Sequence, residues 1–145
     1  MATPIRVTCA VPAFNAGDTT RGIEIARAIH EIGHQRGSEA EITFIYPRTT
    51  QTFEPQICQA GFSVRPMEYD LTEEEVAAIM HADHTGNEFF PDINSAREIL
   101  HVCTRELETH RPDLVVFGFL PPVGIIAQLL RLPSICYAPF PISRP

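Results

Sequence analysis

The sequence predicts an α/β fold: a Rossmann-like, doubly wound parallel sheet in three layers (α/β/α), with probable strand order 3-2-1-4-5. Short apolar runs alternate with amphipathic stretches, which is typical of parallel strands joined by right-handed crossovers. The run "LVVFG" at residues 114–118 is apolar without alternation, which indicates a strand buried on both faces. A chain of 145 residues is expected to form one domain.

The individual elements can be placed by their composition. Residues 5–11 form a mostly apolar run that stops at Pro12, and residues 41–46 are rich in β-branched and aromatic side chains. Each therefore predicts a strand. The other strands are expected at residues 62–65, 114–118 and 134–137, and the helices at residues 19–35, 52–60, from 72 onward, 93–110 and 121–130.

The first helix is predicted to be amphipathic, with small residues that let it lie close to the sheet. The face expected to pack inward carries Gly22, Ile25, Ala26, Ile29, Ile32 and Gly33, and the polar face carries Glu24, Arg27, Glu31 and His34. The helix from residue 93 is expected to turn Ile93, Ala96, Leu100, Cys103 and Leu107 inward.

The helix that starts near Thr72 has the clearest start signal. Thr72 and Glu75 have the spacing of a capping box, and Leu71 and Val76 occupy the positions of a hydrophobic staple. The acidic residues 73–75 lie where a helix N-terminus favours negative charge. We therefore interpret these glutamates as capping groups and not as acid–base catalysts.

Charge and composition exclude several classes of protein. The net charge of −7, with only 11 scattered basic residues, argues against nucleic acid as a partner. The N-terminus does not resemble a signal peptide, and the longest apolar run, residues 114–130, is broken by two prolines and is short for a membrane span. A cytoplasmic protein without a transmembrane segment is expected.

The cysteines and histidines do not have the spacing of a metal site. Cys9, Cys58, Cys103 and Cys136 lie far apart and have apolar neighbours, so buried free thiols are expected. The histidines show no HExxH pattern. We expect no metal.

Two loops are predicted to form the ligand site. In doubly wound sheets, ligands bind beyond the carboxyl ends of the strands where strand order reverses, which points to residues 12–20 and 118–124. The first loop has no GxGxxG motif. Gly17 and Gly22 match the outer glycines of a Walker loop, but Ile23 and Glu24 stand where Lys and Ser/Thr are required. A dinucleotide fingerprint is therefore absent, and an NTPase is not favoured.

Asp18 has two interpretations from its position alone. Aspartate is among the preferred N-cap residues, and such a cap contributes about 0.5–2 kcal/mol. A carboxylate at this cleft can also serve as a general base, which contributes about 10²–10⁴-fold in rate. Both roles can hold at once, and the sequence leaves both open.

Two long stretches resemble a known family. "GDTTRGIEIARAIHEIGHQ", followed by the strand "EITFIYPR", looks like the first loop, helix and next strand of GT-B fold glycosyltransferases, in which a Gly-His or Gly-Asp pair precedes a helix of the type "ALARALRARGH". "RPDLVVFGFLPPVGIIAQLLRLPSICYAPF" is similar to the family's "PDLVV...A..LGIP" segment. The resemblance covers most of the chain in order and spacing.

The resemblance implies a transferase that moves a sugar from a nucleoside-diphosphate sugar, for which a UDP-sugar is expected, to an acceptor hydroxyl. No metal and no tightly bound cofactor are implied. Residues 1–138 would be the N-terminal, acceptor-binding domain and 139–145 the start of the interdomain linker, with the donor-binding C-terminal domain absent. The chain alone is then expected to be inactive.

The resemblance also implies roles for individual residues. Asp18 would be the base, and the donor diphosphate would lie against backbone amides of Gly17, Thr19 and Thr20. An apolar aglycone or a lipid is the expected acceptor. Its predicted contacts are Phe14, Asn15, Phe89, Phe90, Phe119, Leu120 and Pro121. For Phe119 and Leu120, packing in the core is an alternative that the sequence leaves open.

Three positions differ from the family pattern. Arg21 stands where a proline is frequent, and Gly118 and Phe119 stand where an acidic partner of the base is often found. Two alternatives remain open at this point: a non-catalytic docking or recruiting subunit of a split glycosyltransferase, and part of a nucleotide-sugar epimerase.

Overall fold

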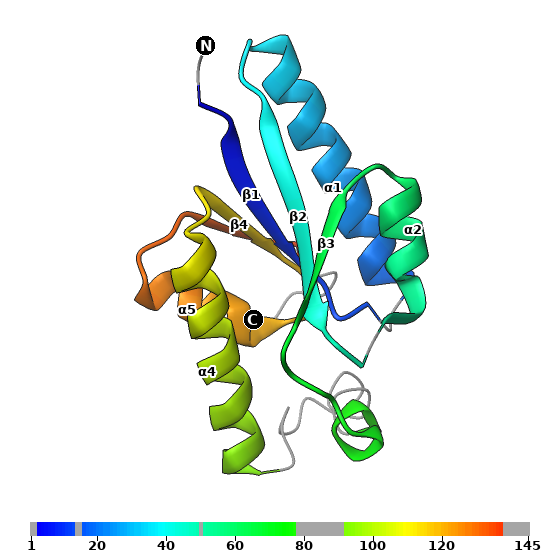
Figure 1. Ribbon diagram of the computed structural model, residues 1–145, viewed down its shortest axis with the longest axis vertical. Coiled ribbons are helices and arrows are strands. Elements are labelled where there is room, and N and C mark those ends of the chain that lie inside the picture. The colour runs from blue at the N-terminus through cyan, green and yellow to red at the C-terminus, as the bar shows by residue number, and fades with distance from the viewer. Residues whose placement is uncertain (1–2, 14–15, 50, 78–91, 138–145) are drawn as a thin grey trace, which may run out of the picture.

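The computed structural model describes residues 3–13, 16–49, 51–77 and 92–137 (Figure 1). Its strands form one five-stranded parallel sheet with the order β3-β2-β1-β4-β5, which confirms the predicted fold class and strand order. The strands are β1 (Ile5–Ala10), β2 (Ala40–Pro47), β3 (Ser63–Met67), β4 (Leu114–Phe117) and β5 (Ser134–Cys136).

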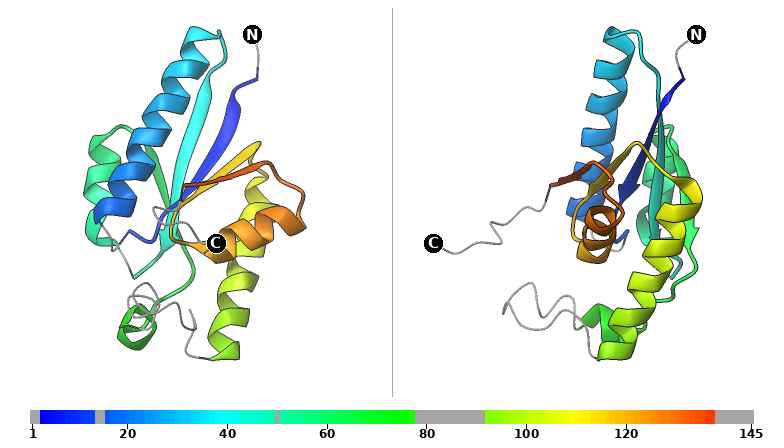
Figure 2. Two further views of the ribbon diagram at one scale, coloured as in Figure 1. Left: turned by 180° about the vertical axis from the view of Figure 1, so that it is seen from behind. Right: turned by 90° about the vertical axis from the view of Figure 1, so that its left-hand side faces the viewer.

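Helices cover both faces of the sheet, so the domain has three layers (Figure 2). α1 and α2 pack on one face, and α4 and α5 pack on the other and contact each other. The helices are α1 (Ala16–Gln35), α2 (Glu54–Gln59), α4 (Ile93–His110) and α5 (Pro121–Leu129), with a 3-10 turn at Gln51–Phe53 and a short helical segment at 73–77.

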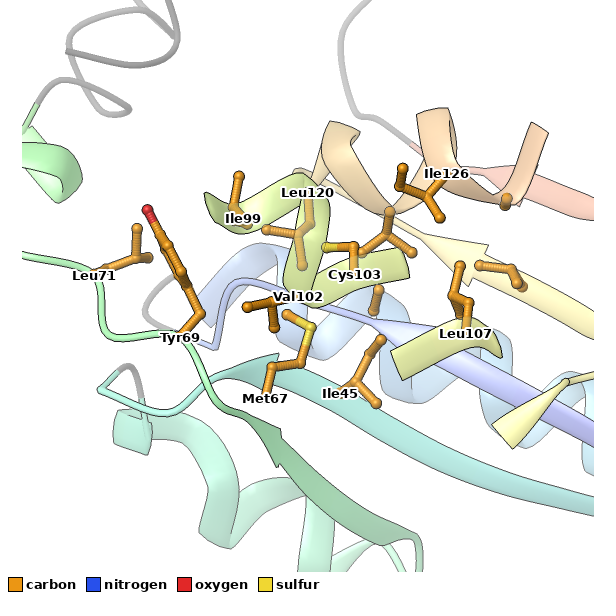
Figure 3. Packing of buried hydrophobic residues seen from close by; sticks show 14 residues of the cluster. Ile45, Met67, Tyr69, Leu71, Ile99, Val102, Cys103, Leu107, Leu120 and Ile126 are labelled. Carbon is orange, nitrogen blue, oxygen red and sulfur yellow. The ribbon is translucent and has the colours of Figure 1, made fainter. Parts of the chain in front are cut away.

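The central strands supply two separate cores because successive side chains point to opposite faces. In β4, Val115 belongs to the core under α4 and α5, whereas Val116 belongs to the core under α1 and α2. Both are completely buried. The prediction that residues 114–118 form a strand covered on both faces is therefore confirmed. Figure 3 shows the first of these cores, in which side chains of α4 and α5 meet those of the sheet.

The inward face of α1 differs from the prediction. Ile23 is buried, whereas Ile32 is 52% exposed. The buried stripe runs through Thr19, Gly22, Ile23 and Ala26 and ends near the middle of the helix. At about 3.6 residues per turn this stripe does not reach position 32. Ile93, also expected inside, is 70% exposed because it lies in the first turn of α4, ahead of the buried residues that begin at Ile99.

The four cysteines are free, but only half of them are buried. Cys9 in β1 and Cys103 in α4 lie in the core, and burial raises the pKa of both thiols to about 12. Cys58 and Cys136 are exposed. The expectation of four buried thiols is wrong for these two because Cys58 lies on the exposed face of α2 and all three residues of the edge strand β5 are exposed.

The capping box at Thr72 is confirmed. The Thr72 N–H donates to Glu75 Oε2 at 2.8 Å, and the Glu75 N–H donates to Thr72 Oγ1 at 3.1 Å. Glu75 is only 7% exposed, and its Oε1 also accepts a hydrogen bond from the Tyr69 hydroxyl at 2.5 Å. Glu75 therefore links the helix start to a core tyrosine.

We expect Glu75→Ala to destabilise the chain more than Thr72→Ala. Loss of the threonine cap costs about 1 kcal/mol. The glutamate substitution also leaves the buried Tyr69 hydroxyl without its acceptor, which adds about 1–3 kcal/mol. Urea denaturation measures both, and Glu74→Ala, an exposed position of the same turn, is the control. A midpoint for Glu75→Ala equal to or above that of Thr72→Ala, or equal to that of Glu74→Ala, would contradict the prediction.

Candidate functional site

The two predicted ligand loops meet at the carboxyl ends of β1 and β4. These strands are neighbours, with Ala10 in register with Phe117. Beyond them the Gly118 N–H donates to the Ala10 carbonyl oxygen at 3.2 Å. The loop after β1 leads into α1 on one face, and the turn after β4 leads into α5 on the other. Strand order reverses here, where doubly wound folds bind ligands.

Asp18 connects these two loops. It lies in the first turn of α1 and is 2% exposed. Its Oδ2 accepts a hydrogen bond from the Phe119 N–H at 3.1 Å, across 101 residues of sequence. Because α1 begins at Ala16, Asp18 lies inside the helix and not at its N-cap. This corrects the interpretation of Asp18 as the residue that precedes the helix.

Burial has the largest effect on the ionisation of Asp18. It raises the pKa of the carboxyl above the ordinary 3.8, against the lowering effects of the Phe119 N–H and of Arg21. The folded state thus binds this proton more tightly than the unfolded chain. The resulting gain in the free energy of unfolding is complete at pH values below the pKa of Asp18 in the unfolded chain. It is lost as the pH rises through the pKa of Asp18 in the folded chain. Above that interval Asp18 is buried as a costly anion.

We therefore expect Asp18→Asn to make the isolated chain at least as stable as the wild type at pH 7. The amide oxygen can still accept from Phe119 N–H, and no charge is buried. The difference in the free energy of unfolding should shrink as the pH falls below the folded pKa of Asp18. Urea denaturation at several pH values measures it. A large loss of stability at pH 7 would show that the anion at the start of α1 stabilises the fold.

Gly118 leaves room for the Asp18 carboxylate. A Cβ atom at position 118 would lie 2.4 and 2.5 Å from its two oxygens, and 2.6 Å from Cε2 of Tyr137. At Gly22, a Cβ would lie 2.9 Å from the Tyr137 hydroxyl oxygen. Any side chain at position 22 or 118 would therefore collide with the groups around Asp18.

Tyr137 is a member of the site that the sequence analysis missed. It follows β5, and its hydroxyl donates to the Asp18 carbonyl oxygen at 3.3 Å. Burial, and then the charge of Asp18, raise the pKa of this hydroxyl, so it stays a donor. The available signal was a pair of glycines, Gly22 on the inner face of a helix and Gly118 directly after a buried strand.

The other predicted site residues differ in exposure. Gly17 and Thr20 are exposed, and Thr19 is completely buried. Leu120 is 3% exposed and belongs to the core in Figure 3. The side chains of Thr19 and Leu120 are therefore turned into the fold. The predicted contact at Thr19 is through its backbone amide, which this burial does not test, and Leu120 packs in the core.

Phe119 and Pro121 are half-buried beside the site. Phe119 packs on the same core as Leu120, and Pro121 begins α5. Phe14, Asn15, Phe89 and Phe90 lie outside the described residues.

Other features of the described residues do not point to a competing site. A groove of about 570 Å³ lies at the opposite, amino-terminal ends of β2 and β3, where its lining includes Ala40 and Ser63. Within the described ranges, no cluster of three or more His, Cys, Asp or Glu side chains could hold a metal ion. Over the same ranges, no helix is both long and apolar enough to cross a membrane.

Solved glycosyltransferase structures share this fold over nearly the whole chain. The match with MurG from Acinetobacter baumannii covers 98% of this chain and 43% of the MurG chain, at a TM-score of 0.64 and 12% sequence identity. The glycotransferase of kitacinnamycin matches 96% with 31% of its own, at 0.60 and 17% identity. Spinosyn rhamnosyltransferase SpnG, solved with thymidine diphosphate, matches 92% with 34% of its own, at 0.56 and 14% identity. The chain has a GT-B glycosyltransferase-like fold.

This GT-B-like fold also occurs in a second class of enzyme. A putative UDP-N-acetylglucosamine 2-epimerase from Listeria monocytogenes matches 93% of the chain with 31% of its own, at a TM-score of 0.57 and 8% identity. The chain spans less than half the length of each of these proteins. No protein-family model and no curated protein sequence matches it. At these identities the likeness concerns the fold.

Proposed function

We propose that the chain is the acceptor-binding half of a longer glycosyltransferase. The observation that carries this proposal is the position of Asp18. The fold is GT-B-like, and the buried Asp18 carboxylate lies beyond the carboxyl ends of β1 and β4, bound to the Phe119 N–H. Residues 1–138 form the acceptor domain in this proposal, residues 139–145 begin the linker, and the donor domain follows in the longer protein. The proposed setting is the cytoplasm.

The proposed reaction is a metal-independent transfer. The Asp18 carboxylate takes the proton of the acceptor hydroxyl, and the hydroxyl oxygen forms a bond to the anomeric carbon of the sugar. The bond between that carbon and the diphosphate oxygen breaks, and the nucleoside diphosphate leaves with the bonding electrons. A raised pKa suits a carboxylate that must accept a proton near neutral pH.

The donor in this proposal is a nucleotide sugar, for which we favour a UDP-sugar. SpnG, which shares the fold, was solved with thymidine diphosphate. On this chain, the backbone amides of Gly17, Thr19 and Thr20 at the start of α1 would face the diphosphate, because helix N-termini attract anions. Although the Thr19 side chain is completely buried, its backbone N–H remains a candidate donor to the diphosphate.

The acceptor in this proposal is a small apolar molecule with a hydroxyl group, an aglycone or a lipid. SpnG has also been solved with the spinosyn aglycone. Around Asp18, Phe119 and Pro121 offer half-buried apolar surface. Phe14, Asn15, Phe89 and Phe90 complete the proposed acceptor contacts, while Leu120 supports them from the core.

The proposal predicts no transfer by this chain alone and transfer by the longer protein. Both are incubated with a panel of UDP-sugars and phenolic acceptors, and products are detected by mass spectrometry. The isolated chain should give none because the proposed donor domain supplies most of the nucleotide contacts. Turnover by the isolated chain would contradict the division into two halves. Absence of turnover by the longer protein on every donor tested would contradict the proposed activity.

The epimerase is a second candidate, favoured by the fold shared with the Listeria protein. The same longer protein is incubated with UDP-N-acetylglucosamine without an acceptor. Formation of its 2-epimer would identify an epimerase, whereas acceptor-dependent release of the nucleoside diphosphate would identify a transferase. A docking subunit would do neither and would instead bind a catalytic partner.

A further inference from the structure

Two glycines far apart in the sequence make room for one aromatic ring. A Cβ at Gly22 in α1 would lie 2.9 Å from the Tyr137 hydroxyl oxygen, and a Cβ at Gly118 after β4 would lie 2.6 Å from Cε2 of the same ring. Tyr137 therefore fits a slot between α1 and the end of β4. The Asp18 carboxylate lies at one end of this slot, within 2.5 Å of the same Cβ position at Gly118.

The ring and the Asp18 carboxylate thus occupy the same small space. Asp18 is 2% exposed although it lies where two loops meet, and the Tyr137 hydroxyl binds its carbonyl oxygen at 3.3 Å. A carboxylate shielded to this degree cannot reach an acceptor hydroxyl. If Asp18 is the base, a neighbouring group has to move.

Tyr137 is attached to the weakest edge of the sheet. β5 has only three residues, all exposed, and among the described strands it pairs with β4 alone. The Tyr137 N–H continues this ladder with one bond to the Phe117 carbonyl oxygen at 3.0 Å. Short edge segments open locally at lower free energy than central strands. By contrast, Phe119, the other neighbour bound to Asp18, lies in the turn before α5, and the adjacent Leu120 packs in the core.

We propose that Tyr137 is the positioning residue that controls access to Asp18: in the slot between Gly22 and Gly118 its ring shields the carboxylate, and its displacement exposes it. Only the statement that this shielding controls catalysis rests on the proposed function. The shielding itself belongs to the isolated chain and can be tested there.

The test is carboxyl labelling of the isolated chain. A water-soluble carbodiimide with glycine ethyl ester modifies exposed carboxylates, and mass spectrometry reads the modification of Asp18. Asp70 and Asp113, whose side chains are each 49% exposed, serve as internal references. In Tyr137→Ala the labelling rate of Asp18 should rise by about tenfold or more, because the shield that limits its local exposure is gone. In Tyr137→Phe, which keeps the ring, the rate should change little.

Two further variants separate shielding from general loosening. Phe62→Ala removes another half-buried aromatic ring of the same core, packed on Phe44 with centroids 5.5 Å apart, and should leave Asp18 protected. Tyr137→Leu keeps apolar bulk if the alanine variant fails to fold, and should give an intermediate rate. Unchanged protection of Asp18 in the folded alanine or leucine variant would overturn the proposal, as would equal labelling in Phe62→Ala.

The longer protein gives a second readout that a purely structural role would not change. Burial raises the pKa of Asp18, and among its neighbours the Phe119 N–H and Arg21 on α1 lower it. Loss of the ring hydrates the carboxylate, so the acidic limb of the kcat/KM profile should move to lower pH in Tyr137→Ala and stay in place in Tyr137→Phe. If the labelling of Asp18 rises in Tyr137→Ala but the acidic limb of the kcat/KM profile does not move, Asp18 is not the base. The shielding of Asp18 by Tyr137 would still hold.

Discussion

Gly118→Ala is expected to lower the free energy of unfolding by about 1–3 kcal/mol, the usual range for added bulk in a packed interior. The new Cβ would lie 2.4 and 2.5 Å from the Asp18 oxygens and 2.6 Å from the Tyr137 ring. Neither neighbour can yield easily, because Asp18 is held by the Phe119 N–H and the Tyr137 ring lies against Gly22. The expected result is a clear fall in the urea midpoint.

A double-mutant cycle identifies the source of this loss. In an Asp18→Ala background the alanine at position 118 no longer meets the carboxylate, so its cost should shrink by about 0.5–3 kcal/mol, the range of coupling between residues in contact. Tyr137→Ala should relieve the other part of the collision. If Gly118→Ala is tolerated in the wild-type background, or costs the same in all three, the close contact around Asp18 is not what the glycine serves.

The sheet could be predicted from the sequence because its signals are local. Apolar runs of the right length mark the strands, and the buried strand at 114–117 reads as an uninterrupted apolar run. The capping box at Thr72 involves two residues three positions apart, so its geometry follows from helix structure alone. The rules for connecting parallel strands limit the possible orders, and 3-2-1-4-5 is the order of the Rossmann-like folds that the sequence resembles.

The sequence predicted that Asp18 lies near the meeting point of two loops, but neither its place inside α1 nor its surroundings. The sequence indicated that the loops after β1 and β4 would meet, and the hydrogen bond between Asp18 and the Phe119 N–H is consistent with this. At Gly118 and Phe119 the family resemblance led us to look for an acidic side chain. The structure instead has a backbone N–H there, which no pattern of side chains can reveal.

Gly22 and Gly118 indicate that something packs closely against them, but the sequence does not identify it as Tyr137, because the role of Tyr137 depends on three segments at once. Residue 137 reads as the end of a strand, and only the folded chain brings it between Gly22 and Gly118. For Leu120 the sequence left both a ligand contact and core packing open, for a related reason. An apolar residue in a loop beside a site can face either a ligand or the core, and only packing decides between them.

The most direct test of the central claim is kcat of Asp18→Asn in the longer transferase, measured at saturating donor and acceptor. The amide keeps the shape of the carboxylate and its bond from the Phe119 N–H, but it cannot take a proton. We predict a fall in kcat of about 10²-fold or more, since general-base catalysis is lost. Glu24→Gln, on the exposed face of α1, is the matched control and should retain wild-type kcat. Near-normal turnover by folded Asp18→Asn would contradict the account and leave Asp18 as a structural link between α1 and the turn after β4.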